Sequence, residues 1–162
     1  MTYSIRPITV QDVPFLWEML YESLYVPEGK EPFSRDILQD PLIAKYVEGW
    51  GREGDSGFIA VNEQGQPIGS ITVRYFDQEN KGFGYVGEDV PELGMAIIKA
   101  YRGKGIGTAL LETLFQDLKA REVQQISLSV DPDNLAAVKL YQRFGFKEAG
   151  MVGTSITMVA DV

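Results

Sequence analysis

Three glycines within five residues, Gly103, Gly105 and Gly107, stand directly ahead of a patterned helix in the stretch RGKGIGTALLETL. The start of a helix presents unpaired backbone N–H groups and a partial positive charge, which together form a natural anion site. Glycines let a phosphate approach these groups without interference from a Cβ atom, and Arg102 and Lys104 add positive charge. The same glycines would also suit a plain turn between a strand and a helix, so both interpretations stay open.

Two familiar phosphate-binding motifs do not fit this stretch. A P-loop, GxxxxGK[ST], needs Ser or Thr after its lysine, whereas Gly105 follows Lys104. The dinucleotide-binding motif GxGxxG needs a third glycine where Thr108 and Leu110 stand, and it normally follows the first strand of a domain. A phosphate at this loop would therefore belong to a different class of ligand.

A carboxylate that could act as a base precedes this loop in the run PELGMAII. The sequence has no histidine and no cysteine, so a general base must be a carboxylate, a lysine, a tyrosine or a relayed water. On a regular strand Glu92, Gly94 and Ala96 point to one face, which predicts a carboxylate with room for a ligand beside it. Glu92 is the best candidate, ahead of Glu88 and Asp89 in the preceding loop. The alternative is an exposed carboxylate at a strand end.

The best candidate for a general acid is a tyrosine in the last predicted helix. Tyr141 lies among Ala137, Val138 and Phe144 at helical spacing. This pattern favours an ordinary core aromatic whose hydroxyl lies at the rim of the core. A tyrosine with its hydroxyl at a rim could also protonate a leaving group, so both roles stay open on the pattern alone.

Alternating and helical patterns predict the elements that must position these residues. Strands are expected at residues 3–8, 57–62, 67–76, 91–98, 125–130, 146–152 and 155–160. Helices are expected from Asp12, from the glycine stretch to about Arg121, and from Asn134 to Gly145, with one or two short helices in residues 27–54. Residues 77–89 carry three glycines and few apolar anchors, which suggests a mobile loop. The order βααβββαβαββ predicts an α/β chain with a mixed sheet and helices on both faces.

Composition excludes several classes of function. The 162 residues suit a single domain, residues 1–162, and no run of about 18 apolar residues predicts a membrane span. The start MTYSIRPITV lacks the features of a signal peptide, so we expect a cytoplasmic protein. The lack of cysteine and histidine excludes disulfides, thiolate metal sites and serine–histidine triads, and no metal site is predicted. A net charge of −8 argues against nucleic acid and indicates either plain solubility or attraction of cationic small molecules.

The strand–turn–helix ELGMAIIKAYRGKGIGTALLETL resembles the acyl-CoA site of the GNAT superfamily of N-acetyltransferases. The hallmark of that family, Q/R-x-x-G-x-G/A, is matched by Arg102, Gly105 and Gly107. Its fuller form, an apolar strand and a tyrosine–arginine pair before the loop, is matched by Met95, Ile97 and Tyr101. One departure is Lys99, where many members carry proline; this should change the rigidity of the turn more than its chemistry.

A second segment, NLAAVKLYQRFGF from Asn134 to Phe146, resembles another element of the same family. The likeness covers nearly the whole chain, strongly from about residue 90 to 148. It implies a central mixed, mostly antiparallel sheet of about seven strands. It also implies the residues that would hold acetyl-CoA as co-substrate. They are Met95, Ala96 and Ile97 for the pantetheine arm, Asn134 on the cofactor side, and Arg102, Gly103, Lys104, Gly105, Ile106, Gly107 and Thr108 for the pyrophosphate.

The resemblance implies an acetyltransferase that moves an acetyl group to a primary amine by direct attack in a ternary complex. Glu92 would be the base, Tyr141 would protonate the departing thiolate, and the N–H of Ile97 would donate to the acetyl oxygen. The acceptor would be a small-molecule or peptide amine, with a cationic one as an option. The alternative is an inactive acyl-CoA-binding regulatory module. The candidates to line an acceptor pocket are Tyr25, Trp50, for which surface packing is the alternative, and Trp17, which suits a core position better.

The last two predicted strands could present an edge for pairing with a second copy of the chain. A homodimer is therefore one option, and the pattern leaves the oligomeric state open. The acceptor is equally open, because the family sets it with the segment after the first helix and the loop near residues 77–89, which are the least patterned parts of this sequence.

Overall fold

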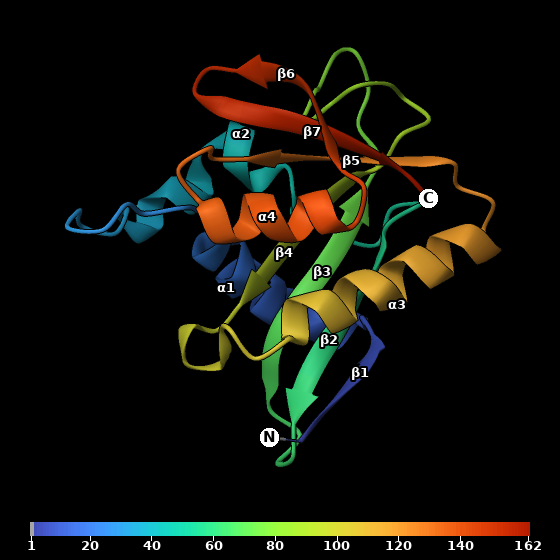
Figure 1. Cartoon of the computed structure of the whole chain (residues 1–162). Coiled ribbons are helices and arrows are strands. Elements are labelled where there is room, and N and C mark those ends of the chain that lie inside the picture. The colour runs from blue at the N-terminus through green and yellow to red at the C-terminus, as the bar shows by residue number, and fades with distance from the viewer. Residues whose placement is uncertain (1) are drawn as a thin grey trace.

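The computed structural model describes residues 2–162, which form a seven-stranded sheet in the order β1-β2-β3-β4-β5-β7-β6 (Figure 1). All neighbouring strands are antiparallel except β4 and β5, which are parallel. The predicted mixed, mostly antiparallel sheet is therefore confirmed. The strands are β1 (Tyr3–Pro7), β2 (Ser56–Asn62), β3 (Pro67–Arg74), β4 (Glu92–Ile97), β5 (Gln125–Val130), β6 (Lys147–Val152) and β7 (Ser155–Asp161).

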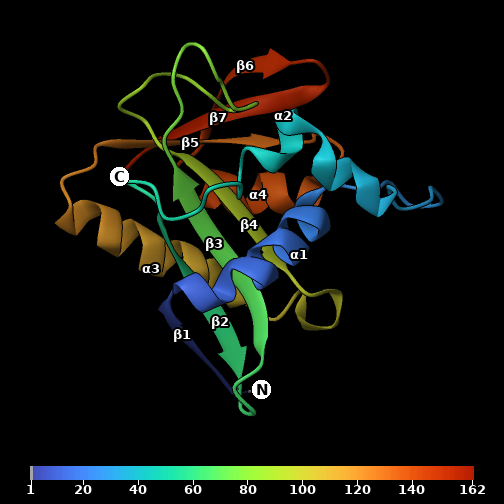
Figure 2. The same cartoon turned by 180° about the vertical axis from the view of Figure 1, so that it is seen from behind.

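Helices cover both faces of this sheet, as predicted. On one face lie α3 (Ile106–Ala120) and α4 (Leu135–Arg143), in front in Figure 1. On the other lie α1 (Val13–Ser23) and the short α2 (Pro41–Ala44), in front in Figure 2. Short 3₁₀ turns at Val10–Asp12, Arg35–Gln39 and Lys99–Tyr101 complete the helical segments. None of the helices in residues 2–162 has both the length and the apolar character that crossing a bilayer demands.

The packing of α3 on the sheet follows from its apolar stripe. Its leucines and isoleucine recur every three or four residues, so they share one face of the helix. That face is fully buried against the interior strands, while the opposite side meets solvent. The buried stripe, which fixes where the helix begins relative to the sheet, consists of Ile106, Leu110, Leu111, Leu114 and Leu118.

Strands β4 and β5 diverge directly after they meet. Within residues 2–162 their pairing consists of one register pair, Glu92 with Ser127, supported by a hydrogen bond of 3.0 Å from the Ser127 N–H to the Pro91 carbonyl. Figure 1 shows β4 running at a steep angle away from β5 towards the start of α3. Because β4 keeps β3 as its partner along its whole length, only its β5-facing edge is left open.

Candidate active site

The glycine-rich loop leads from the end of β4 into α3 with two residues in left-handed conformation. Gly103 has φ of 73° and Gly105, the residue before the first turn of α3, has φ of 85°. Side-chain-bearing residues rarely adopt such angles, so the chain needs glycine at both positions. A Cβ atom at either would have no neighbour within 4 Å, so the outer side of the loop is open. The loop thus presents its backbone to a ligand without obstruction.

Gly107 has a different role from the other two glycines. It is buried in the first turn of α3, where a Cβ atom would lie 3.3–3.5 Å from side chains of Leu140, Ile97 and Met95. Its missing side chain therefore lets α3, α4 and the end of β4 pack closely. The lack of a side chain at Gly107 thus serves this packing, and the prediction that its backbone also meets a phosphate stays a prediction. The same contacts show that the segments predicted to hold acetyl-CoA converge at the start of α3.

The open edge of β4 carries backbone groups that can bind an extended ligand. In an antiparallel pair the N–H and C=O of one residue point to the same side, and successive residues alternate. The N–H of Ile98 donates to the carbonyl of Ile68, at 2.9 Å, on the β3 side. By alternation, the backbone groups that face the gap towards β5 are those of Leu93, Met95 and Ile97. Ala96 instead turns its backbone towards β3.

Arg102 ties the glycine-rich loop to this edge. Its Nε donates to the carbonyl of Ile97 at 2.8 Å, and its Nη2 lies 3.3 Å from Oε2 of Glu22 on α1. The carbonyl of Ile97 is therefore occupied while its N–H stays available. Lys104 is exposed and Thr108 half-buried in the first turn of α3. Lys104 therefore presents its charge to solvent, whereas the guanidinium of Arg102 contacts Ile97 and Glu22; the role of both residues in holding a phosphate stays a prediction.

Asn134 opens α4 as predicted, and its side chain is engaged in capping that helix. Its Oδ1 accepts a hydrogen bond of 3.4 Å from the N–H of Ala137. Just before it, the carbonyl of Asp133 accepts a hydrogen bond of 3.2 Å from the hydroxyl of Tyr25. This contact links the segment after α1 to the end of β5. Tyr25 thereby lies beside the turn that carries Asn134.

Tyr141 lies on α4 within the main core. The residue is 8% exposed, and its ring packs edge-on against Phe146 with 5.6 Å between centroids. Burial raises the pKa of Tyr141 to about 12, so its hydroxyl stays protonated at neutral pH. Within residues 2–162 that hydroxyl makes no hydrogen bond, which leaves its proton free to be donated. A Cβ atom on Gly107 would lie 3.3 Å from the neighbouring Leu140, which places this part of α4 next to the glycine-rich loop.

Glu92 is one of the few buried ionisable residues, with only 3% of its surface exposed. Its Oε2 accepts a hydrogen bond of 2.6 Å from the hydroxyl of Tyr46. Its Oε1 is enclosed and has no hydrogen-bond partner of normal geometry. Burial raises the pKa of Glu92 to about 7, while Tyr46, the nearby Gly84 N–H and Lys45 act in the opposite direction. The interpretation as an exposed strand-end carboxylate is therefore wrong, and the role of Glu92 as a base stays a prediction.

The space next to Glu92 is filled rather than open. A Cβ atom on Gly82 would lie 2.2 Å from Oε1 of Glu92 and 2.8 Å from the Tyr46 hydroxyl. The small neighbours Gly94 and Ala96 do share a face with Glu92, as predicted, and α1 packs on that face. The predicted room for a ligand directly beside the carboxylate is wrong, because the segment 82–84 covers it.

The prediction of a mobile loop at residues 77–89 does not describe its centre. The N–H of Phe83 donates to the Tyr46 hydroxyl at 2.7 Å, and its carbonyl accepts from Oγ1 of Thr157 at 3.2 Å. Gly84 packs on the backbone of β5, where a Cβ atom would lie 2.6 Å from the Leu128 carbonyl carbon. Glycines, which suggested mobility in the sequence, here allow close contact between the loop and the sheet.

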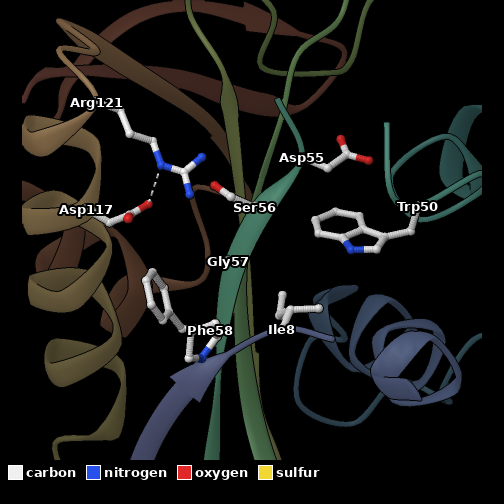
Figure 3. Close-up of a pocket in the computed structure, with 9 residues that line it drawn as sticks. Ile8, Trp50, Asp55, Ser56, Gly57, Phe58, Asp117 and Arg121 are labelled. Atoms are coloured by element: carbon white, nitrogen blue, oxygen red, sulfur yellow. Dashed lines mark ion pairs between the residues drawn. The ribbon is translucent and has the colours of Figure 1, made fainter. Parts of the chain in front are cut away.

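Of the tryptophans suggested for an acceptor pocket, Trp17 packs against the smaller core cluster and Trp50 lines a pocket elsewhere. That pocket, about 240 Å³ in volume, lies at the start of β2 and the last turns of α3 (Figure 3). The helix rise of about 1.5 Å per residue puts it about 20 Å from the glycine-rich loop. The residues of this pocket labelled in Figure 3 are Ile8, Trp50, Asp55, Ser56, Gly57, Phe58, Asp117 and Arg121.

Sequence reasoning missed Tyr46, which contacts both Glu92 and the loop that covers it. The residue lies in the irregular segment between α2 and β2, where no periodic pattern marks a buried face. A hint was available in the run AKYVEGW, whose Tyr46, Val47 and Trp50 are apolar or aromatic residues at helical spacing. That hint indicates burial and would not have pointed to Glu92.

The chain belongs to the acetyltransferase (GNAT) family, whose sequence model matches residues 14–146. An N-acetyltransferase of Methanocaldococcus jannaschii is 25% identical over 162 residues, which cover 98% of this chain and 66% of the relative. Aminoglycoside N(6')-acetyltransferase type 1 of Klebsiella pneumoniae is 29% identical over 160 residues, covering 93% of this chain and 77% of that protein.

A solved structure with the same fold is the PaiA N-acetyltransferase of Thermoplasma acidophilum in complex with coenzyme A. Its TM-score is 0.72 at 20% identity, and the match covers 100% of both chains. This likeness concerns the fold, including the seven-stranded sheet and the helices on its two faces.

Proposed function

We propose that this protein is an acetyl-CoA-dependent N-acetyltransferase that acts on a primary amine in a ternary complex. The observation that carries the proposal is that two groups of free backbone N–H donors, one on the edge of β4 and one in the glycine-rich loop, lie next to each other. The open edge of β4 offers the N–H groups of Met95 and Ile97, and it runs directly into an unobstructed glycine-rich loop at the start of α3. An extended arm that ends in phosphates fits this geometry, and acetyl-CoA is such a molecule.

The residues of the loop fit the phosphate end of the cofactor. Backbone N–H groups from Arg102 to Thr108 lie at a helix start, where the macrodipole favours an anion. Gly103 and Gly105 leave their outer side open, and Lys104 adds an exposed positive charge. The turn that carries Asn134 would bound the cofactor on the α4 side. Acetyl-CoA would supply the acetyl group and leave as free CoA.

The amine acceptor must lose its ammonium proton, because alkylammonium groups have a pKa near ~10. Glu92 is proposed as the base. It lies three residues before Met95 and five before Ile97 on β4, which is about 10 and 17 Å at ~3.3 Å per residue. This separation favours a proton path through water over direct contact with the amine. Tyr141 is proposed to donate its proton to the departing thiolate of CoA.

An acceptor that is itself cationic suits the net charge of −8, since an acidic surface attracts positive ligands over about a Debye length. The relative from Klebsiella pneumoniae carries the name of an aminoglycoside acetyltransferase, which is consistent with an amine acceptor. We therefore propose small polycationic amines as the first class of acceptor to test.

Gly105→Glu is expected to abolish the binding of acetyl-CoA. The new side chain adds bulk and negative charge at the phosphate loop and strains a left-handed residue. In the unchanged protein, acetyl-CoA at about 100 times its Kd should add about 2.7 kcal/mol to folding stability. That gain corresponds to a rise in Tm of roughly 5–10 °C for a chain of this length, measured by thermal shift.

The matched control is Gly153→Glu in the turn between β6 and β7. Gly153 also has positive φ, 59°, and open space around its Cα, so the substitution brings the same strain and charge at a distance from the loop. It should lower the basal Tm and keep the shift with acetyl-CoA. An intact shift in Gly105→Glu would place the cofactor elsewhere.

A further inference from the structure

Tyr46 connects the proposed base to the loop that covers it. Its hydroxyl donates to Oε2 of Glu92 at 2.6 Å and accepts from the N–H of Phe83 at 2.7 Å. Its ring packs edge-on against Phe76, with 5.2 Å between centroids. Both the donor and the acceptor capacity of this hydroxyl are thus used, which fixes its orientation.

The segment that carries Tyr46 is held on the sheet by a buried arginine. Arg74, the cross-strand partner of Glu92 on β3, is 1% exposed. Its guanidinium donates to the carbonyls of Lys45 and Glu48 at 2.8 and 2.6 Å and pairs with Asp55 at 2.9 Å. Because these carbonyls flank Tyr46 on either side, its position over Glu92 is set by the β3–β4 register.

The two oxygens of Glu92 consequently differ in their surroundings. Oε2 accepts from Tyr46, whereas Oε1 lies under Gly82 and has no hydrogen bond of normal geometry, although the Gly84 N–H lies near the carboxylate. Buried polar atoms are nearly always well paired, so a buried carboxylate oxygen without a good hydrogen bond calls for an explanation beyond packing.

We propose that Tyr46 is a positioning residue for proton transfer, which occupies Oε2 of Glu92, favours the ionised carboxylate and leaves Oε1 to receive the proton that the acceptor amine gives up. This inference rests on the proposed acetyltransferase function. The proton moves to Oε1 and no other bond changes at Glu92. Tyr46 keeps its own proton throughout, because burial and the adjacent Glu92 carboxylate both raise its pKa far above neutrality.

Few other charges act on Glu92 at this position. Lys45 faces it from the segment of Tyr46 and donates its Nζ to the Lys81 carbonyl at 2.7 Å. From β3, Arg74 faces it but turns its guanidinium to Asp55, and β5 contributes the hydroxyl of Ser127. The acidic residues of α1 are ion-paired elsewhere, with Glu18 bound to Arg35 and Glu22 bound to Arg102. Tyr46 is therefore the hydrogen-bonding side chain that favours the ionised form of Glu92.

Tyr46→Phe tests this role because it keeps the ring and removes only the hydroxyl. Loss of a hydrogen bond to the charged carboxylate should raise the pKa of Glu92 by about one pH unit. The carboxyl signal of Glu92, labelled with ¹³C and assigned with Glu92→Gln, reports this titration by NMR without need of activity. The acid limb of the pH–rate profile for CoA release should move up by the same amount. The rate at pH 7 should then fall about fivefold and that at pH 9 by less than about twofold.

Tyr3→Phe is the matched control. Tyr3 lies on β1 and packs against the main core, and within residues 2–162 its hydroxyl makes no hydrogen bond, so the Glu92 titration and the pH–rate profile should both coincide with those of the unchanged protein. In the Glu92→Gln background, Tyr46→Phe should have no further effect on the rate, because it acts through Glu92.

A Glu92 titration that stays in place in Tyr46→Phe overturns the proposal. The proposal is also overturned if the Glu92 titration of Tyr46→Phe shifts while the acid limb of its pH–rate profile stays in place. A loss of rate in this variant that is equal at every pH has the same consequence. Failure of the proposed function itself would be seen separately, as an unchanged protein that binds acetyl-CoA and acetylates no amine.

Discussion

Glu92→Gln is expected to lower kcat at pH 7 by at least about a hundredfold, the usual contribution of a positioned base. Glutamine keeps the shape of the side chain and can still accept from the Tyr46 hydroxyl through its amide oxygen. It removes the group that takes the ammonium proton, in a chain without histidine or cysteine to replace it. In the unchanged enzyme, kcat should rise with pH through about 7, the pKa that burial gives Glu92. In the variant this limb should be absent.

The loss should be partly recovered at high pH, where free amine becomes plentiful. Glu79→Gln is the matched control, since it removes the same charge from the exposed part of the loop before β4. A Glu92→Gln enzyme with the pH–rate profile of the unchanged protein would assign the proton transfer to another group, such as Glu88.

The Glu92→Gln variant should gain thermal stability while it loses activity. Because the pKa of Glu92 is raised on folding from about 4.5, its ionisation opposes the folded state as the pH rises from there to about 7. The Tm of Glu92→Gln relative to the unchanged protein should therefore increase over this range. Thermal melts at several pH values provide this check and separate loss of the base from loss of the fold.

Tyr141→Phe should lower kcat by about 10²–10⁴, the range for loss of a positioned general acid, with little change in Tm. The substitution keeps the edge-on packing on Phe146 and removes a hydroxyl that makes no hydrogen bond within residues 2–162. A tyrosine whose pKa is about 12 is protonated at every pH of interest and can reprotonate a thiolate. Steady-state CoA release measures the effect.

Tyr3→Phe serves as the control for Tyr141→Phe. Tyr3 packs against the same hydrophobic core from β1, and loss of its hydroxyl should leave kcat unchanged. A Tyr141→Phe enzyme with kcat within about threefold of the unchanged protein would return Tyr141 to the role of an ordinary core aromatic.

Regular periodicity made most of the fold predictable. The stripe from Ile106 to Leu118 repeats with the helical period and is buried as expected. The alternating run QISLSV coincides with β5, and the helix from Asn134 ends before Gly145, which has φ of 88°. These signals are local, because each arises within one element that has one buried face.

The surroundings of Glu92 could not be predicted in the same way. The hydrogen bond from Tyr46 joins residues 46 positions apart, and Tyr46 lies in a segment without periodic pattern. The cover over the carboxylate comes from Gly82, and a glycine in a loop looks the same in sequence whether it permits motion or close contact. Strand alternation did predict which face of β4 carries Glu92, but not what packs on that face.

The glycine-rich loop shows the same limit on a smaller scale. The family pattern and the helix start identified Gly103, Gly105 and Gly107 together as phosphate-binding residues. Only the packing of α4 against α3 separates the buried Gly107 from the two open, left-handed positions. That packing brings Gly107 of α3 close to Leu140 of α4, and β5 separates these helices in the sequence. The local motif therefore cannot reveal it.

Release of free CoA from acetyl-CoA in the presence of amines is the most direct test of the proposed acetyltransferase. The chain has no cysteine, so a thiol reagent reads only the CoA that is formed. Polyamines, aminoglycosides, amino acids and N-terminal peptides should be compared with a sample that lacks acceptor. We expect at least one cationic amine to release CoA above that background, with a KM that rises as salt is added. Binding of acetyl-CoA with no release above background for any amine would contradict the account and indicate an inactive acyl-CoA-binding module.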